Sequence, residues 1–169
     1  MAKALFKGKV IIIGVSGSIA AYKAAEIVSY LAQREARVSV VMTQAATHLV
    51  RPLTFQTLAH NRVYTDLPDG FGQAGLWDLQ ADFNPEHISL AEKADLILIA
   101  PATANIIGKI AHGIADDLLT TVVMATRAPI ILAPAMNEKM YLNPIVQENI
   151  AYLKKHGYHC IIPGKGYLA

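Results

Sequence analysis

Residues 9–23, KVIIIGVSGSIAAYK, carry the strongest structural signal of the chain. The run from Lys9 to Val15 is rich in β-branched residues, which is typical of a strand. Residues 16–18 are the turn formers Ser-Gly-Ser, and apolar residues then recur at helical spacing from Ile19 to Glu35. This segment therefore predicts a strand, a tight turn and a helix in that order.

The alternation of strand and helix continues along the chain. Alternating strands and helices predict a parallel sheet that is covered on both faces. The fold class is therefore α/β, a three-layer Rossmann-like (flavodoxin-like) parallel sheet with helices on both faces, in one domain of residues 1–169. We expect further strands at Arg37–Thr43, Asp95–Ala100, Pro129–Pro134 and Tyr158–Pro163, and helices at Thr47–Ala59, Ala104–Thr126 and Pro144–His156; periodicity also returns at Ile88–Lys93.

The composition favours one compact domain without a membrane span. Of the 169 residues, 53% are hydrophobic and 17% are charged, and the mean hydropathy is +0.33. No apolar run approaches the ~18–20 residues of a transmembrane helix. The hydrophobic excess therefore indicates buried parallel strands and buried surfaces between subunits.

Charge and cysteine content narrow the classes of partner. The net charge is +2 without clusters of lysine and arginine, so nothing predicts binding to nucleic acid, whereas anionic small molecules fit this charge. Cys160 is the only cysteine, so an intrachain disulfide cannot form and a cytoplasmic location is expected. The apolar run after the N-terminal lysines continues into a turn without a cleavage site, which predicts a strand and not a signal peptide.

The segment from Asn61 to Glu86 breaks the pattern. It is rich in glycine, proline and aspartate, and it is longer than the loops of compact domains usually are. We expect part of it to form a lid or a contact between subunits.

The turns that follow the predicted strands are the expected place of function. Ligands of open parallel sheets bind beyond the carboxyl ends of the strands, near the point where the strand order reverses. The turns are Gly14–Ile19, Thr43–Thr47, Pro101–Asn105 and Pro134–Met140. All are rich in small polar residues or proline, and they carry few charges.

The first of these turns has the composition of an anion site. Gly17 and Ser18 precede a helix, whose free N–H groups and dipole favour a phosphate. A simple helix cap by Ser18 explains the same residues, and the turn alone slightly favours this alternative. The turn matches neither the G-x-G-x-x-G fingerprint nor a P-loop, which disfavours those nucleotide sites.

The later turns offer polar groups to a planar cofactor. Thr103 is a candidate helix cap, and Asn105 offers a donor and an acceptor to a ring edge or a ribityl hydroxyl. Two such turns on neighbouring strands indicate a phosphate-bearing planar cofactor. In PAMNEKMY, residues 134–141, an amide and two thioethers suit a small polar group held above an apolar ring; methionines that merely fill gaps are an equal alternative.

Among the six histidines, His87 is the best candidate for acid–base work, because it ends the irregular segment and leads toward a buried strand. A structural or solvated histidine is the commoner case. No histidine pair has metal-ligand spacing with a carboxylate or Cys160, so we expect no metal site. Asp116 and Asp117 lie inside the predicted long helix, where adjacent side chains point apart, and a structural or interface role is expected.

Several motifs follow one another along the chain: GSIAAYK at 17–23, HISL at 87–90, APATAN at 100–105, GIADDLLT at 113–120 and PAMN at 134–137. Each motif alone is weak, and the ordered set is specific. Together they resemble one family, the homo-oligomeric flavin-containing cysteine decarboxylases. The resemblance extends from about Lys9 to the last residue and is strongest to the phosphopantothenoylcysteine decarboxylase branch, which is half of a bifunctional coenzyme A biosynthesis flavoprotein.

The resemblance implies an FMN-dependent carboxy-lyase that binds FMN between the subunits of a trimer or of a dodecamer. His87 would be the catalytic residue, and Asn137 and Met140 would bind the substrate, 4′-phosphopantothenoylcysteine. The residues that would contact FMN are Gly17, Ser18, Ile19, Thr43, Thr103, Asn105 and Ala135.

In this family the flavin oxidises the cysteinyl C–S unit to a thioaldehyde, which accepts the electron pair released as CO₂ leaves and gives an enethiol. Reduced FMN then returns a hydride while an acid protonates the neighbouring carbon, which yields 4′-phosphopantetheine. In the coenzyme A branch, a cysteine that follows a segment similar to Gly166–Ala169 is this acid, and the chain stops before it. We therefore expect decarboxylation to the enethiol, and we expect a phosphopantothenate–cysteine ligase domain to be absent from this chain. Cys160 is not expected to replace the acid.

Other members of the same superfamily remain alternatives. A peptidyl-cysteine decarboxylase of lantibiotic-type pathways stops at the enethiol, but residues 166–169 favour the coenzyme A branch. A non-catalytic flavin-binding regulator shares the fold and the histidine, although its usual acidic tail is missing here. A flavin prenyltransferase does not suit the PAMN segment. Tyr141 stands where the family usually has a tryptophan or another aromatic residue, and tyrosine is tolerable there.

Overall fold

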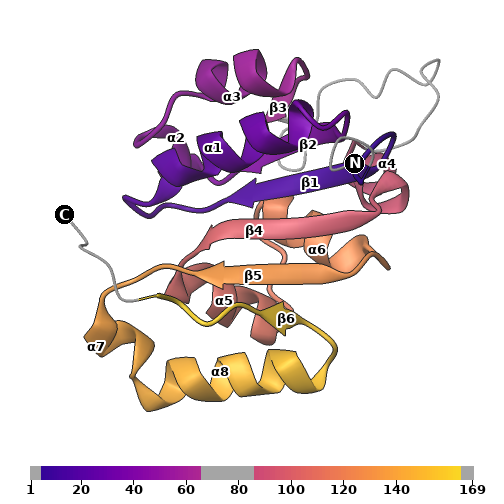
Figure 1. The fold of residues 1–169 in the computed structure, drawn as a ribbon. Helices are drawn as coiled ribbons and strands as arrows, with labels where there is room; N and C mark the ends of the chain where they lie inside the picture. Colours follow the sequence, from indigo (N-terminus) through magenta and orange to yellow (C-terminus); the bar gives the residue numbers. More distant parts are fainter. Residues whose placement is uncertain (1–4, 66–85, 165–169) are drawn as a thin grey trace, which may run out of the picture.

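A parallel sheet of six strands forms the centre of the described chain, residues 5–65 and 86–164 (Figure 1). The computed structural model gives only the backbone of Glu86 and His87. The strand order is β3-β2-β1-β4-β5-β6, with every neighbouring pair parallel. The predicted Rossmann-like fold is thus confirmed, and the order is that of Rossmann domains and not of flavodoxins. The strands are β1 (Val10–Val15), β2 (Arg37–Met42), β3 (Val63–Tyr64), β4 (Leu96–Ala102), β5 (Ile130–Pro134) and β6 (His159–Cys160).

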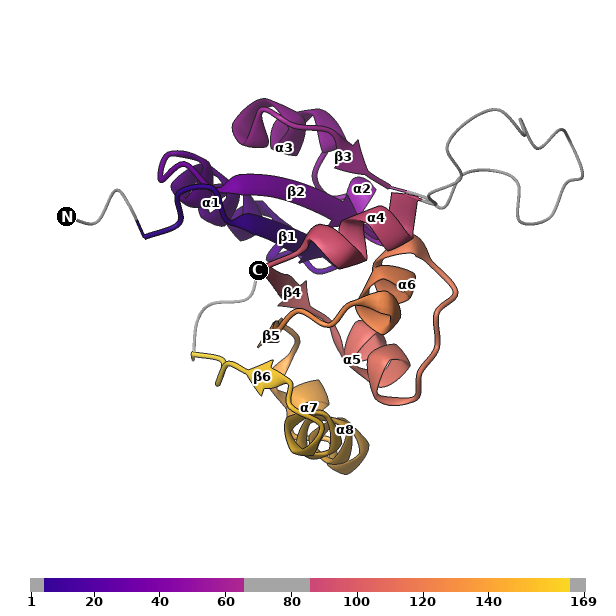
Figure 2. The same cartoon turned by 90° about the vertical axis from the view of Figure 1, so that its right-hand side faces the viewer.

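Helices cover the two faces of the sheet (Figure 2). One face carries α1 and α3, the opposite face carries α4, α5 and α6, and α8 packs beside α5 next to β5 and β6. Within the described residues no helix is long and apolar enough to cross a bilayer. The helices are α1 (Ala21–Ala32), α2 (Gln44–Thr47), α3 (Pro52–Ala59), α4 (Glu86–Lys93), α5 (Ala104–Ala111), α6 (Leu118–Ala125), α7 (Glu138–Tyr141) and α8 (Pro144–Lys155).

The β-branched run of β1 is buried on both sides of the sheet. Ile11 and Ile13 join the core beneath α1 and α3, whereas Ile12 joins the core beneath α5 and α6. Successive side chains of a strand point to opposite faces, so a strand covered on both faces must be apolar at every position. Burial on both faces therefore explains why residues 10–13 are uninterrupted Val and Ile.

The helix predicted at Ala104–Thr126 is two helices, α5 and α6, and the single long helix was wrong. Asp117 begins α6 with a capping box, because its side chain accepts from the Thr120 N–H and the Thr120 hydroxyl oxygen accepts from the Asp117 N–H. Gly113 before it has a φ of +68°, a left-handed conformation that ends a helix. Apolar residues continue through both helices, so hydrophobic spacing alone did not reveal the break.

Two further boundaries differ from the prediction. The helix predicted at Thr47–Ala59 is the short α2 followed by α3, because Pro52 lies in the first turn of α3 and disfavours helical backbone before it. The segment predicted to be irregular contains β3, which pairs with β2. Its residues 66–85 lie outside the described residues, and so does the expected lid or subunit contact. The strand predicted at Tyr158–Pro163 is shorter in the structure, where β6 comprises His159–Cys160.

Replacing Phe55 should destabilise the protein strongly, because its ring is the largest fully buried side chain and fills the core beneath α1 and α3. We expect Phe55→Ala to lower the free energy of unfolding by ~3–5 kcal/mol. Gln56→Ala on the exposed side of the same helix should change it by less than about 0.5 kcal/mol. Urea unfolding measures both, and equal effects of the two substitutions would contradict this core.

Candidate functional site

A cleft lies at the carboxyl ends of β1 and β4. These are the neighbouring strands at which the strand order reverses (Figure 1). Its volume is about 670 Å³, which is within the ~300–1,000 Å³ usual for small-molecule sites. The cleft therefore occupies the position at which open parallel sheets bind ligands. Its lining residues are Ser16, Gly17, Ser18, Thr43, Gln44, Ala45, Thr103, Ala104, Asn105, Ile106, Lys109, Asp116, Asp117, Ala135, Met136 and Met140.

The Ser16 hydroxyl joins the two turns that form the floor of the cleft. The side chain is buried, with only 2% exposed. Its Oγ donates to the Pro101 carbonyl at 2.7 Å, and the Thr103 N–H donates to the same Oγ at 3.1 Å. A buried hydroxyl needs such partners, so this bridge holds the end of β1 against the start of α5.

Residues that line this cleft carry backbone N–H groups without a partner among the described residues. Thr103 caps α5, since its Oγ1 accepts from the Ile106 N–H at 3.3 Å. Among the described residues, the N–H groups of Gly17, Ala104 and Asn105 have no protein acceptor. Unpaired N–H groups at a helix N-terminus carry partial positive charge, so they favour an anion or a carbonyl oxygen.

Gly17 allows a close approach between the first turn and α2. A Cβ at this position would lie 2.6 Å from the Cβ of Ala45 and 3.3 Å from its carbonyl carbon. Both neighbours belong to the backbone framework and cannot turn aside. Thr43 caps α2 by accepting from the Ala46 N–H at 3.3 Å, so β2 and α2 form a tightly packed wall of the cleft.

Three side chains carry full charge among the described residues that line the cleft. The Lys109 ammonium is 2.7 Å from Asp116 Oδ1 and 3.3 Å from Asp117 Oδ2. The hydrogen bond from Lys109 lowers the pKa of Asp116, and the hydrogen bond to Asp116 raises the pKa of Lys109. One ammonium and two carboxylates give the cleft a formal net charge of −1. Asp117 caps α6, and Asp116 pairs with Lys109 of α5. The prediction that both aspartates lie inside one long helix was wrong.

The structure brings most of the predicted site residues together. Ile19 and Asn137 do not line the cleft but adjoin the lining residues Ser18 and Met136. His87 lies in the first turn of α4, and its side chain lies outside the described residues. The predicted residues that line the cleft are Gly17, Ser18, Thr43, Thr103, Asn105, Ala135 and Met140.

The sequence reasoning did not single out Ser16 and Gln44, although both lie in turns that it named, and it missed Lys109 as a lining residue. Ser16 had a local signal, because a polar residue directly follows a strand that is apolar on both faces. Lys109 had none, since its position at the cleft depends on how α5 is oriented. Cys160 lies half-buried in β6, where burial raises the pKa of its thiol. No three His, Cys, Asp or Glu side chains in the described ranges are grouped to hold a metal ion.

Comparison with known proteins decides the family. The family model described as flavoprotein matches residues 3–169. The chain belongs to the flavoprotein family. A flavin is therefore the class of cofactor for this flavoprotein, and the cleft fits one: free N–H groups suit a phosphate, while Asn105 and the Met136 and Met140 thioethers suit a polar-edged ring.

Individual relatives of this flavoprotein are similar over most of the chain. It is 48% identical over 162 residues to the coenzyme A biosynthesis bifunctional protein CoaBC of Bacillus subtilis, covering 94% of the chain but 37% of that relative. It is 45% identical over 166 residues to a probable phosphopantothenoylcysteine decarboxylase of Streptococcus mutans, covering 95% and 86%. The crystal structure of the FMN-dependent cysteine decarboxylase SpaF superposes with a TM-score of 0.82 at 33% identity, covering 96% and 88%. The chain thus spans less than two fifths of its bifunctional relative.

Gly17→Ala should weaken flavin binding, because the added methyl group forces the first turn and α2 apart. We expect about a tenfold or larger rise in the flavin Kd and a loss of ~1–3 kcal/mol in unfolding free energy. Gly108→Ala is the matched control, since its methyl group would meet only Asn149 Nδ2 at 3.8 Å. Flavin fluorescence during titration and urea unfolding measure the two effects. Equal flavin affinity in both variants would contradict the close approach.

Proposed function

We propose that this flavoprotein catalyses the FMN-dependent decarboxylation of 4′-phosphopantothenoylcysteine in coenzyme A biosynthesis. The single observation that carries the proposal is the cleft at the β1–β4 switch point, where turns 16–18, 103–106 and 135–140 meet. The Streptococcus mutans relative, a probable phosphopantothenoylcysteine decarboxylase, is similar along 86% of its own length. That similarity supports a decarboxylase domain of residues 1–169.

Bound FMN would supply a two-electron acceptor for the cysteinyl unit of the substrate. The chain's own part is to hold and orient. The free N–H groups of Gly17, Ala104 and Asn105 would receive acceptor atoms of the cofactor, in the absence of an unpaired lysine or arginine among the described lining residues. Binding a phosphate by dipoles in this way is typical of helix N-termini.

Asn137 is suited to hold the substrate carboxylate. Its Oδ1 accepts from the Lys139 N–H at 2.9 Å, which caps α7 and orients the amide. The two N–H donors of the amide have no acceptor among the described residues, and a carboxylate accepts such donors well. Met140 lines the cleft one helical turn later and would offer a thioether to the apolar part of the substrate. His87 would act on the substrate as acid, base or orienting group.

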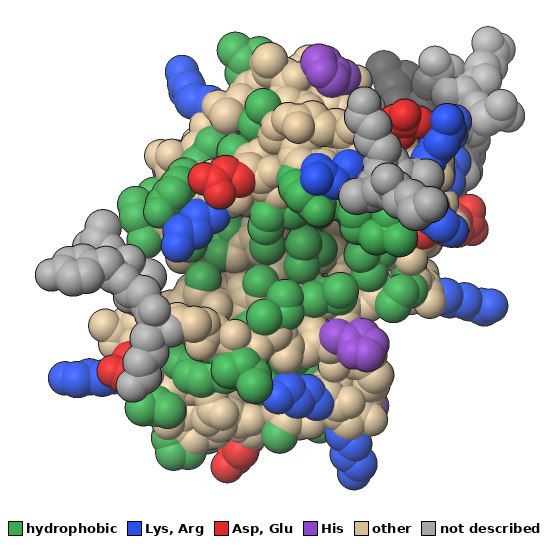
Figure 3. Space-filling view, viewed as in Figure 1, with side chains coloured by type: hydrophobic (Ala, Val, Ile, Leu, Met, Phe, Trp, Pro, Cys, Tyr) green, Lys and Arg blue, Asp and Glu red, His purple; other side chains and the backbone are tan. Residues whose placement is uncertain are grey.

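Self-association is part of the proposal. Large apolar side chains are exposed at α7, α8 and after β6, including Leu142, Ile145 and Ile162, the last with 80% exposed. Hydrophobic side chains also gather in a band between α1 and α8 on the face seen in Figure 3. Burial of such patches drives association, which supports the trimer or dodecamer predicted from the sequence. A cytoplasmic location and a ligase domain as partner belong to the same proposal.

A second candidate is decarboxylation of a peptidyl cysteine. The superposition on the FMN-dependent cysteine decarboxylase SpaF supports the same chemistry without specifying coenzyme A intermediates. The two candidates share cofactor and reaction and differ in what lies beyond the cysteine. A regulatory role without catalysis would leave flavin binding intact and abolish CO₂ release, so one assay separates all three.

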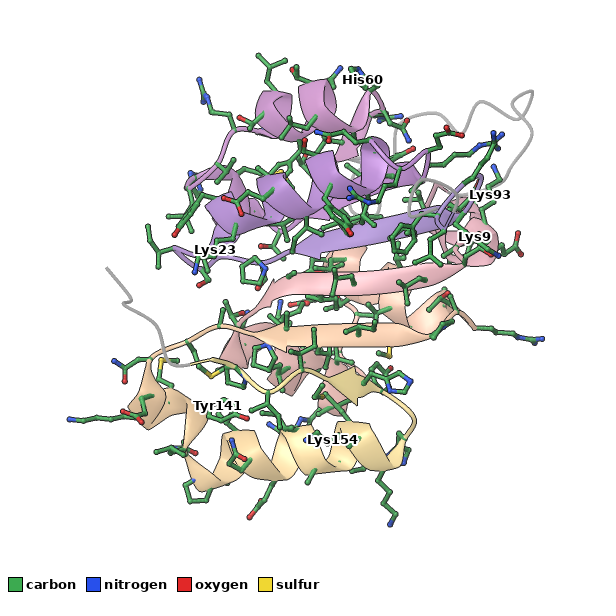
Figure 4. All side chains as sticks on the ribbon, in the orientation of Figure 1. Lys9, Lys23, His60, Lys93, Tyr141 and Lys154 are labelled. Carbon is green, nitrogen blue, oxygen red and sulfur yellow. The ribbon has the colours of Figure 1, made fainter. Side chains whose placement is uncertain are left out.

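His87→Asn should abolish decarboxylation while FMN stays bound, because it removes the proposed acid–base group. We expect CO₂ release from 4′-phosphopantothenoylcysteine to fall by a factor on the order of 10²–10⁴. His60→Asn is the matched control. His60 ends α3 away from the lining residues (Figure 4), and its left-handed φ of +49° suits asparagine.

Carbon dioxide release and product mass measure the outcome. A product two mass units below phosphopantetheine would mean that the reaction stops at the enethiol. Release from a peptide ending in cysteine, but not from the small substrate, would favour the second candidate. A flavin-loaded protein that releases CO₂ from neither would contradict both enzymes, and an active His87→Asn variant would contradict the role of His87 alone.

A further inference from the structure

Lys109 belongs to α5 and is the one cation among the described residues that line the cleft. It lies one helical turn after Asn105, so both side chains lie on the same side of α5. Its side chain is only 21% exposed, although lysine is usually solvated. Two aspartates surround its ammonium, which has three N–H donors. A donor therefore remains for a third acceptor.

The two aspartates that pair with Lys109 differ in how many other hydrogen bonds fix their own side chains. Asp117 is tied down, because its Oδ1 accepts from the Thr120 N–H and from the Thr120 hydroxyl, both at 2.8 Å, and it caps α6. Asp116 is 55% exposed, and Lys109 is its sole side-chain partner in the described chain. Exposed ion pairs contribute little to stability, so Asp116 can exchange for another anion at small cost.

We propose that Lys109 binds a phosphate monoester in the cleft, and that Asp116 occupies the position of this anion until the ligand arrives. Asp117 keeps the ammonium in place during the exchange. Asp117 lowers the attraction between the Lys109 ammonium and the phosphate, because it remains beside the ammonium. The phosphate must therefore also use neutral donors such as the Asn105 amide. A phosphate that belongs to the substrate rests on the proposed function. A phosphate that belongs to the flavin cofactor requires only that the chain binds a phosphorylated flavin.

Pairs of ligands with and without phosphate distinguish the two sources. The first pair is FMN and riboflavin, whose dissociation from the loaded full chain is followed by the recovery of flavin fluorescence. The second pair is 4′-phosphopantothenoylcysteine and pantothenoylcysteine, whose KM and kcat are measured on the FMN-loaded chain. Each variant is compared within a pair, so that a general loss of stability cancels.

Lys109→Met should weaken the phosphorylated member of one pair by about tenfold or more and leave its partner within about twofold. Lys109→Arg should restore most of the affinity, because it keeps the charge. Asp116→Asn should strengthen the same phosphorylated ligand, because it removes the competing anion. Lys154→Met on the exposed side of α8 is the matched control and should change neither pair (Figure 4).

Equal losses for both members of both pairs, or no loss in either pair, would overturn the proposal. If Lys109→Met does not fold, an Asp116→Asn variant without selective strengthening overturns it instead. Failure of the proposed function has a different signature. CO₂ release would be absent while the Lys109 dependence of FMN over riboflavin persisted.

Discussion

The bridge made by the Ser16 hydroxyl is the interaction on which the site depends. One buried oxygen satisfies the Pro101 carbonyl and the Thr103 N–H, and thereby joins the ends of two strands that are far apart in sequence. Because β1 and β4 are neighbours at the point where the strand order reverses, their turns diverge above the sheet and leave a cleft. The junction joins the turns that bring Gly17, Ala104 and Asn105 to the same cleft, and the N–H groups of these residues have no acceptor among the described residues.

The cleft combines unpaired backbone donors with an ion cluster of net negative charge. Its donors are mostly uncharged backbone groups, whereas its single lysine among the described lining residues is already paired with two carboxylates. Pre-oriented dipoles can hold an anion without the desolvation penalty of a buried cation. The ion cluster also joins α5 to α6, because Asp117 both caps α6 and pairs with Lys109.

The polar and apolar groups of the cleft suit a flavin on physical grounds, in agreement with membership of the flavoprotein family. A planar cofactor with a phosphate needs donors at one end and a polar-edged apolar surface at the other. The first turn and the start of α5 offer the donors, and the segment with Met136 and Met140 offers the thioether surface. The same segment carries Asn137, whose capping bond leaves two donors beside that surface.

The sequence by itself determined every strand of the described sheet except β3, the sheet class and most of the turns that line the cleft, because β-branched runs and capping residues such as Thr103 act over a few neighbouring positions. It did not reveal the break between α5 and α6, since apolar spacing continues across the Asp117 cap. Tertiary structure alone decided that Ser16 meets Thr103, that Gly17 meets Ala45, and that Lys109 reaches into the cleft between two aspartates. These contacts join residues brought together by strand order and helix orientation, which depend on packing of the whole core and not on local propensity.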